Sequence, residues 1–504
     1  MLLDEEAAIL FSKSQLDNLT EMLKSINIVF PEKYKNNFVK YKKNSDPNKI
    51  IYELCLNNAN EIFNNKVPVE YKDRIDYEIS IISQMGFSDY FLVVQDYVNY
   101  AKNNNISVGP GRGSAVGSLV SYLLKITEVD PIKHGLIFER FLNPDRIGMP
   151  DIDIDFEDAK RNMVTKYLYD KYGSEHIAHI ITFQKMKAKM AIRDVGRVLE
   201  MPLIIINSIV KYFGFDNEND IVKAINDSKE LKEFNNKYPL LFELSNRILN
   251  FPRQVGIHAS GVIVSDEPLT NIIPIQTSSD IIYSTQCSMD YLEEMGLIKL
   301  DILGLSNLSS ISQMIELIHK NYQKNINCLD IPLDDSLIFK KLSNGDTSGI
   351  FQLESPGMTN LIIRIKPTSI EDISICSALF RPGPQKNIPT YLFNKQNPND
   401  IVYINDVFKK ILSSTYGIII YQEQVIEIIK EICNFSTAQS DTFRKIISKK
   451  QIEKMNKIKD EFISAAINNK YTLDQANEIF NYMYEFANYG FNHAHSIAYS
   501  YISY

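Results

Sequence analysis

The chain has 504 residues, of which 44% are hydrophobic and 23% charged, and its formal net charge is −8. This composition is ordinary for a globular protein of several domains, and it argues against a non-specific nucleic-acid binder coated in Lys and Arg without excluding a basic cleft. Five separated cysteines without a CxxC pair, no apolar run of about 20 residues and no signal-peptide pattern predict a reduced, cytoplasmic protein without a zinc site or membrane span.

The first hundred residues are predicted to be mainly helical. An amphipathic helix is expected around residues 16–26, and a helical region with aromatic and aliphatic faces over residues 77–102. A short strand at residues 106–108 is then expected to lead into a glycine-rich turn and a helix over residues 114–126.

The glycine-rich turn reads GPGRGSAVGS over residues 109–118. Backbone N–H groups at a strand-to-helix turn suit phosphate, and Arg112 and Ser114 add a charged and a hydroxyl donor. The turn is not a Walker A loop, because no GK[ST] closes it. A purely structural turn, in which Gly117 permits close packing, is the alternative.

Residues 150–156 read PDIDIDF, which alternates at the period of a β-strand. One face would carry Asp151, Asp153 and Asp155, and the other Ile152, Ile154 and Phe156. Two carboxylates one pleat apart can hold two Mg²⁺ ions. A calcium loop is disfavoured, because its sixth and twelfth positions hold Phe156 and Asn162 instead of Gly and Glu. The pattern alone leaves a metal site and a solvated acidic strand face open.

A helix is predicted after this strand, with Asp158 as its N-cap and Gly173 at its end. Its expected apolar stripe is Val164, Tyr167, Leu168 and Tyr172. Residues 183–257 are then mostly helical, residues 258–301 form strands, and the rest is helical again. One mixed sheet is therefore predicted, split in sequence by a helical insertion.

A Gly-Ser turn followed by a strand with D-x-D resembles the palm of the β-type nucleotidyltransferase superfamily. That resemblance implies a third carboxylate from a later strand. The segment KLDILGL supplies Asp301, with Lys299 two residues before it. A turn residue at the end of a strand is the alternative for Asp301.

Nine sequence blocks extend the resemblance over residues 77–504. They are GPGRGSAVGSLVSYLLKITEVDP, FERFLNPDRIGMPDIDIDF, IRDVGRV, GIHASGVIV, KLDILGL, FQLES, ALFRPGP, TYGIIIYQEQV and YGFNHAHSIAYSYISY, in this order. Together they resemble the bacterial DNA polymerase III α subunit family, which are family C replicative polymerases. The resemblance implies template-directed transfer of dNMP from dNTP to a primer 3′-OH in chromosomal DNA replication.

The same resemblance implies an α+β fold, in which a β-type nucleotidyltransferase palm with a mixed sheet carries a helical thumb and incomplete, mainly helical fingers. The expected limits are 1–45 for the helical tail of a missing PHP domain, 46–182 and 258–303 for the palm, 183–257 for the thumb and 304–504 for the partial fingers. The family continues into clamp-binding and further C-terminal regions, so a central fragment is expected, without the PHP and clamp-binding regions that would contact other replisome subunits.

Site residues also follow from the resemblance. The catalytic residues and ligands of two Mg²⁺ ions would be Asp151, Asp153 and Asp301, with Asp155 in support. The nucleotide would be held by Arg112, Gly113, Ser114, Arg140, Lys299, Arg444 and Lys445. Primer-template DNA would be bound by Lys185, Lys187, Lys189, Arg193 and Arg197.

The chain departs from the family pattern at three of these places. Lys445 stands where the family usually has Arg, Gln184 and Lys185 where it has Gly-Thr, and His493 where it has Lys. Lysine at 445 keeps the charge but loses the two-pronged geometry of a guanidinium. Two alternatives to a polymerase are a catalytically impaired fragment that only binds primer-template DNA and another β-type nucleotidyltransferase.

Overall fold

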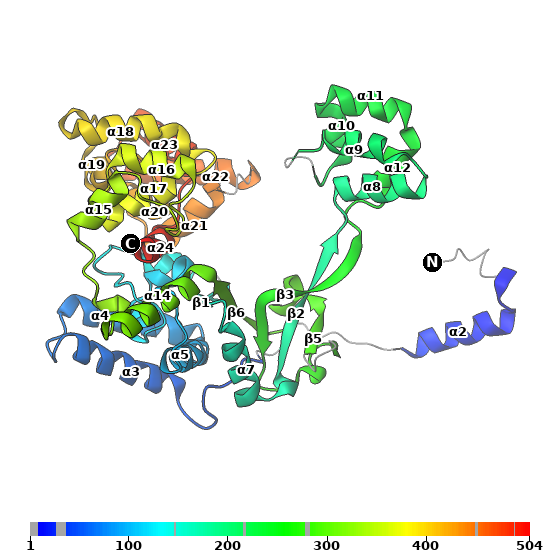
Figure 1. The fold of residues 1–504 in the computed structure, drawn as a ribbon, viewed down its shortest axis with the longest axis horizontal. Coiled ribbons are helices and arrows are strands. Elements are labelled where there is room, and N and C mark those ends of the chain that lie inside the picture. The colour runs from blue at the N-terminus through cyan, green and yellow to red at the C-terminus, as the bar shows by residue number, and fades with distance from the viewer. Residues whose placement is uncertain are drawn as a thin grey trace.

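The computed structural model describes residues 9–26, 37–145, 148–214, 218–277, 283–448, 452–487 and 489–504. It has three connected parts around one sheet (Figure 1). The sheet and its helices form a base, a small helical module stands on a long strand pair at one side, and a larger helical body stands on the other. The predicted α+β fold is confirmed.

Six strands form one mixed sheet, in the order β1-β6-β3-β2-β5-β4. Their bounds are β1 Asp153–Glu157, β2 Ile177–Lys185, β3 Pro252–Val264, β4 Ile275–Thr277, β5 Tyr283–Ser288 and β6 Ile298–Leu305. The pairs β1/β6 and β2/β5 are parallel, whereas β2/β3, β3/β6 and β4/β5 are antiparallel. The predicted mixed sheet, interrupted in sequence by helices, is therefore confirmed.

The helices of the base are α3 Pro47–Ile62, α4 Val69–Gln84, α5 Ser88–Asn103, α6 Leu119–Leu123, α7 Arg161–Tyr172 and the short α13 Met289–Leu292. The apolar side chains of β1 anchor the acidic strand among them: Ile154 and Phe156 are buried in one cluster with Phe91 and Tyr97. Burial of each such side chain stabilises the fold by about 1.5–3 kcal/mol. The acid-bearing strand is thus fixed by its apolar face.

Several local predictions can be compared with these elements. The helix near residues 16–26 is confirmed as α2 Lys13–Ser25, and residues 77–102 form parts of two helices because Gly86, with φ +76°, turns the chain between them. The predicted strand at 106–108 is reduced to a single bridge from Val108 to Phe156. The predicted helix over 114–126 is instead the 3-10 turn η1 Gly113–Gly117 followed by α6, because Ser118 is extended between them.

Asp158 is not the cap of α7. That helix begins at Arg161 after Lys160, and the Asp158 carboxylate accepts a hydrogen bond from the Ser309 hydroxyl instead. The predicted end at Gly173 is confirmed, because this residue has φ +90°, which glycine adopts without strain. The predicted stripe also faces the core: Val164 and Leu168 are buried.

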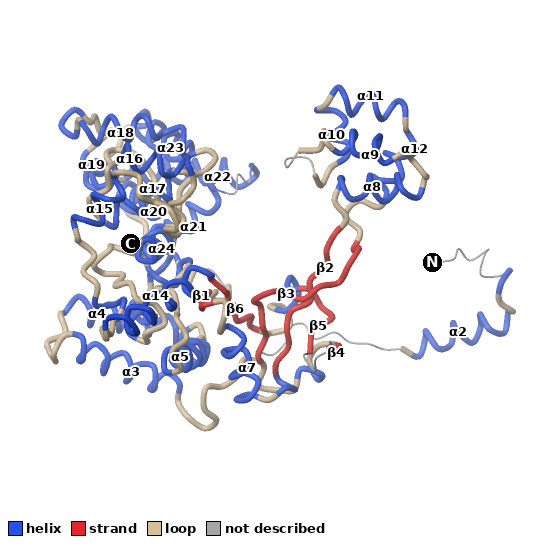
Figure 2. The backbone as a smooth tube through the Cα atoms, in the orientation of Figure 1, coloured by secondary structure: helices blue, strands red, loops and turns tan. Residues whose placement is uncertain are grey.

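The thumb-like module contains α8 Ala188–Val198, α9 Leu203–Val210, α10 Ile221–Asp227, α11 Lys229–Lys237 and α12 Pro239–Arg247. It has its own core, which includes Ile192, Ile206 and Phe242. Strands β2 and β3 reach it as a two-stranded arm (Figure 2). Phe183 pairs with Val255, so the strand pair of the sheet continues into the segment 183–257 that was predicted as the thumb.

Helix α14 Ser306–Tyr322 follows β6 directly and lies at the base, in contact with β1 (Figure 1). The larger helical body comes after it. Its helices are α15 Ser336–Ser343, α16 Pro356–Ile365, α17 Ile370–Leu379, α18 Ile388–Gln396, α19 Asp406–Leu412, α20 Gln422–Cys433, α21 Thr437–Ser448, α22 Ile452–Asn468, α23 Leu473–Ala487 and α24 His493–Ser503. The last helix, α24, contacts both α17 and the 3-10 turn η1. Residues from the end of the chain therefore reach the glycine-rich turn near its beginning.

The segment 1–45 is described only in part, since residues 1–8 and 27–36 lie outside the described residues. Helix α2 stands apart from the body and has no buried residue. Across the described residues, no helix is both long and apolar enough to cross a membrane.

Candidate active site

Three carboxylates meet at the start of β1 and in the middle of β6. Asp153 lies directly opposite Asp301 in the parallel pairing of the two strands, and Asp151 precedes β1 by two residues. One carboxylate oxygen from each of the three lies within 4.8 Å of the others. The three acids expected to form one cluster are thus brought together, two by one strand segment and the third across the sheet.

Negative charge in this cluster is unfavourable, because the carboxylates are close together and partly buried. Burial, with the neighbouring charges of Asp151 and Asp301, raises the pKa of Asp153 to about 7. Burial also raises the pKa of Asp151, although Lys299 opposes this. One oxygen of Asp301, Oδ1, is buried and has no hydrogen-bond partner among the described residues. Oxygen ligands at this spacing, short of positive charge, fit a divalent cation.

Lys299 supplies positive charge at the edge of the cluster. Its Nζ lies 2.6 Å from Oδ2 of Asp301. Although burial lowers the pKa of Lys299, the hydrogen bond to Asp301 and the charge of the acids raise it overall. The side chain therefore remains protonated beside the acids, where the sequence predicted it.

Asp155 lies outside the cluster, although it shares the alternation of β1. Its buried carboxylate accepts hydrogen bonds from Nη1 of Arg112 at 3.2 Å and from the hydroxyl of Tyr499 at 3.0 Å. Arg112 also donates to the Tyr499 hydroxyl at 2.9 Å, and its Nε lies 3.9 Å from Oδ2 of Asp153. Asp155 thus orients the guanidinium that faces the acids.

The glycine-rich turn lies against the same acids. A Cβ placed on Gly113 would lie 4.0 Å from Oδ2 of Asp153, and the Gly113 N–H donates to Nδ1 of His495 at 3.3 Å. Burial lowers the pKa of His495 to about 4, so the ring is neutral and can accept this bond. Ser114 follows in η1. The main chain therefore brings Arg112, Gly113 and the acids into one site.

Tyr499 and His495 are site residues that the sequence did not single out for these roles. The signal for them was the block YGFNHAHSIAYSYISY, in which both are found. No local pattern links this block to the turn at 109–118, because the contacts depend on how α24 docks on η1.

The other predicted nucleotide residues form a second group. Arg140 ends the short helix η2 Phe138–Arg140 and donates to Oε1 of Gln422 at 2.9 Å. Arg444 is buried in α21, where its Nε and Nη2 both bind Oδ1 of Asp441, and Lys445 lies 3.2 Å from Oδ2 of the same residue.

The charges of both arginines in this group act on one buried carboxyl, that of Glu423. Burial raises its pKa, and the charges of Arg140 and Arg444 both lower it, so both guanidinium groups lie within electrostatic reach of one carboxyl. Among the described residues, Arg444 and Lys445 pair with Asp441 and make no direct contact with the acidic cluster. Their role toward nucleotide stays a prediction.

The predicted DNA-binding side chains lie on the thumb-like module. All five are exposed: Lys185 at the end of β2, Lys187 before α8, and Lys189, Arg193 and Arg197 on α8. Helix α8 buries Ala188, Ala191, Ile192 and Val195, which leaves its basic positions on the solvent side. Lys187 pairs with Glu218, and Arg197 lies 3.5 Å from Asp194.

A mixed sheet that pairs a D-x-D strand with a third acid, beside a Gly-Ser turn, defines a nucleotidyltransferase palm. Residues 49–304 match the family described as the bacterial DNA polymerase III alpha NTPase domain, and residues 307–470 match the finger domain of the same subunit. The chain belongs to the bacterial DNA polymerase III alpha subunit family.

Curated relatives agree with this assignment. The chain is 49% identical to DNA polymerase III subunit alpha of Ureaplasma parvum, over 99% of this chain and 52% of the relative. Identity is 42% to the protein of that name from Bacillus subtilis, over 89% and 40%, and 44% to that from Staphylococcus epidermidis, over 86% and 41%. The chain thus spans about half or less of the length of these relatives.

Proposed function

We propose that this chain is a DNA-directed DNA polymerase of bacterial chromosomal replication, working in the cytoplasm. It would transfer dNMP from dNTP to the 3′-OH of a primer, as directed by a template. The observation that carries the proposal is the pairing of Asp153 with Asp301 beside the glycine-rich turn. The names of the relatives support the activity.

Asp151, Asp153 and Asp301 would hold two Mg²⁺ ions. Bound Mg²⁺ lowers the pKa of an attacking hydroxyl and neutralises a leaving pyrophosphate. The chain itself would orient the triphosphate: Arg112 and Lys299 supply charge beside the acids, and the N–H groups of the turn supply donors. Positioning and charge stabilisation are most of what a protein contributes to such a reaction.

Primer-template DNA would lie against the thumb-like module. The exposed basic side chains on β2 and α8 suit the phosphate backbone, which is contacted without regard to sequence. The relatives are named as a subunit, which supports an assembly with further replisome proteins.

The proposal is tested by primer extension with the 504-residue chain, Mg²⁺ and all four dNTPs. We expect template-directed incorporation by the unaltered chain and a loss of at least about 100-fold in Asp153→Asn, with primer-template affinity retained. The matched control is Asp73→Asn, which makes the same change at an exposed position on α4. If the unaltered chain binds DNA but incorporates nothing, this chain only binds DNA. An active Asp153→Asn would overturn the assigned role of this acid.

A further inference from the structure

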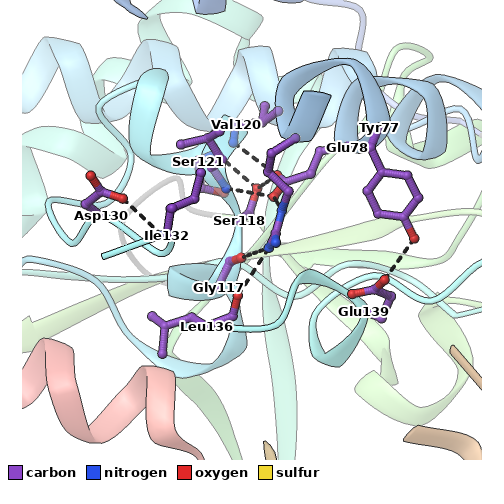
Figure 3. Close-up of polar contacts among 12 residues, drawn as sticks. Tyr77, Glu78, Gly117, Ser118, Val120, Ser121, Asp130, Ile132, Leu136 and Glu139 are labelled. Atoms are coloured by element: carbon purple, nitrogen blue, oxygen red, sulfur yellow. Dashed lines mark hydrogen bonds and ion pairs between the residues drawn. The ribbon is translucent and has the colours of Figure 1, made fainter. Parts of the chain in front are cut away.

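Helix α4 carries a buried ion pair that contacts the end of the glycine-rich turn. Glu78 is fully buried, and its Oε1 lies 2.6 Å from Nε of Arg74, one helical turn away (Figure 3). An isolated buried carboxylate is costly, so its partners indicate why it is retained. Neither residue belongs to the acidic cluster or to the predicted nucleotide contacts.

Glu78 binds the chain directly after the glycine-rich turn. Its carboxylate accepts hydrogen bonds from the Ser118 hydroxyl at 2.7 Å, the Leu119 N–H at 3.0 Å and the Val120 N–H at 3.1 Å (Figure 3). Burial raises the pKa of Glu78, and Arg74 with these N–H groups opposes the rise. One carboxylate therefore fixes the end of the turn that carries Arg112, Gly113 and Ser114.

Arg74 joins this turn to a second segment. Its Nη2 donates to the carbonyl oxygen of Gly117 at 3.1 Å and to that of Leu136 at 3.2 Å. Close approach of the two segments requires glycine at 117, because a Cβ there would lie 2.8 Å from the carbonyl oxygen of Ile137. The guanidinium thus bridges two backbones that are already in contact.

The second segment leads into η2, which ends at Arg140. A third α4 side chain contacts it: the Tyr77 hydroxyl donates to Oε1 of Glu139 at 2.9 Å (Figure 3). Three side chains of α4 thus fix both the turn with Arg112 and the turn with Arg140. The first is the segment that the proposed function assigns to the triphosphate, and the second carries Arg140, which the sequence predicts to contact the nucleotide.

We propose that Arg74 and Glu78 are positioning residues that set the separation of these two segments, and so the affinity of the site for dNTP. This inference rests on the proposed function. Because neither side chain is placed on the triphosphate, each acts through the backbone that it holds. A displacement of about 1 Å is enough to weaken a multidentate phosphate site.

The test measures binding of a fluorescent dATP analogue to the full chain with Ca²⁺, so it needs no turnover. Arg74→Lys retains a charge for Glu78 but loses the guanidinium geometry, in which Nε binds Glu78 while Nη2 donates to the carbonyl oxygens of Gly117 and Leu136. We expect its dATP affinity to fall about tenfold, with primer-template affinity unchanged within about twofold. Tyr77→Phe, at an exposed position, should lower dATP affinity about threefold. Asp73→Asn, exposed on the same helix, should change neither affinity.

The outcomes separate the possible failures. Folded Arg74→Lys and Tyr77→Phe variants that bind dATP as well as the unaltered chain would overturn the positioning role. A fall in thermal stability without a fall in dATP affinity would give these residues a purely structural role, which also overturns it. Failure of the unaltered chain to bind dATP overturns the proposed function, and this inference with it.

Discussion

Asp153 and Asp301 face each other across the parallel pair β1/β6, although the whole thumb-like module lies between them in sequence. Burial and the charges of Asp151 and Asp301 raise the cost of ionising Asp153, because like charges at short distance repel in a partly buried site. The pair is therefore unfavourable for the fold without a cation and favourable for binding one.

The first prediction is that Asp153→Asn stabilises the metal-free protein while removing activity. With a pKa raised from 3.8 to about 7, the folded state holds a proton that the unfolded state has lost between about pH 4 and pH 7. Stability from this group therefore falls as the pH rises through that range. We expect the variant to be about 1–3 kcal/mol more stable at pH 8, with no difference below about pH 4. Urea denaturation in EDTA measures this, and equal stability at pH 8 would contradict it.

The second prediction concerns the pH dependence of cation binding. A cation must displace the proton of Asp153, so the affinity for Mn²⁺ or Mg²⁺ should rise by up to about tenfold for each pH unit below pH 7 and level off above it. Isothermal titration calorimetry between about pH 5.5 and 8.5 gives the profile. In Asp153→Asn, binding should be weak and this dependence flattened. An affinity that does not change with pH would contradict the assignment of Asp153 as a ligand.

The third prediction is that Tyr499→Phe loosens the contact between α24 and the site. The change removes the hydroxyl that binds Asp155 at 3.0 Å and accepts from Arg112 at 2.9 Å, and it leaves a buried carboxylate with one partner fewer. We expect a loss of about 1–3 kcal/mol in the free energy of unfolding and a weaker dNTP affinity. Tyr484→Phe, which loses a more exposed hydroxyl, is the matched control and should change the stability little. A Tyr499→Phe protein as stable as the unaltered chain would contradict this.

The fourth prediction concerns the exposed face of α8. Within the part of the chain that the structure describes, Lys189 and Arg193 form no ion pair, so both charges can meet phosphate. Lys189→Ala with Arg193→Ala should weaken primer-template binding and reduce the slope of log K against log salt by about 1 for each phosphate that is no longer neutralised. dNTP affinity should not change. Lys223→Ala, on α10 of the same module, is the control. If the slope of log K against log salt does not change, the DNA does not bind to this face of α8.

Local patterns in the sequence were enough to predict those features that depend on neighbours along the chain. The alternation of residues 150–156 gave β1 its buried face, and the spacing of Val164 and Leu168 gave α7 its packing side. Gly173 ended that helix, because a position with φ +90° favours glycine. Asp158 was misplaced as a cap, because its carboxylate binds Ser309, a partner remote in sequence.

Only the tertiary structure decided which distant groups meet. Strand pairing sets Asp301 opposite Asp153, and the docking of α24 brings Tyr499 to Arg112 and Asp155. Buried Glu78 could not have been separated from a solvated helix face by sequence spacing alone, since its partners Ser118 and Val120 come from another element. Periodicity reports which face of an element is apolar, whereas the register between elements depends on packing over the whole fold.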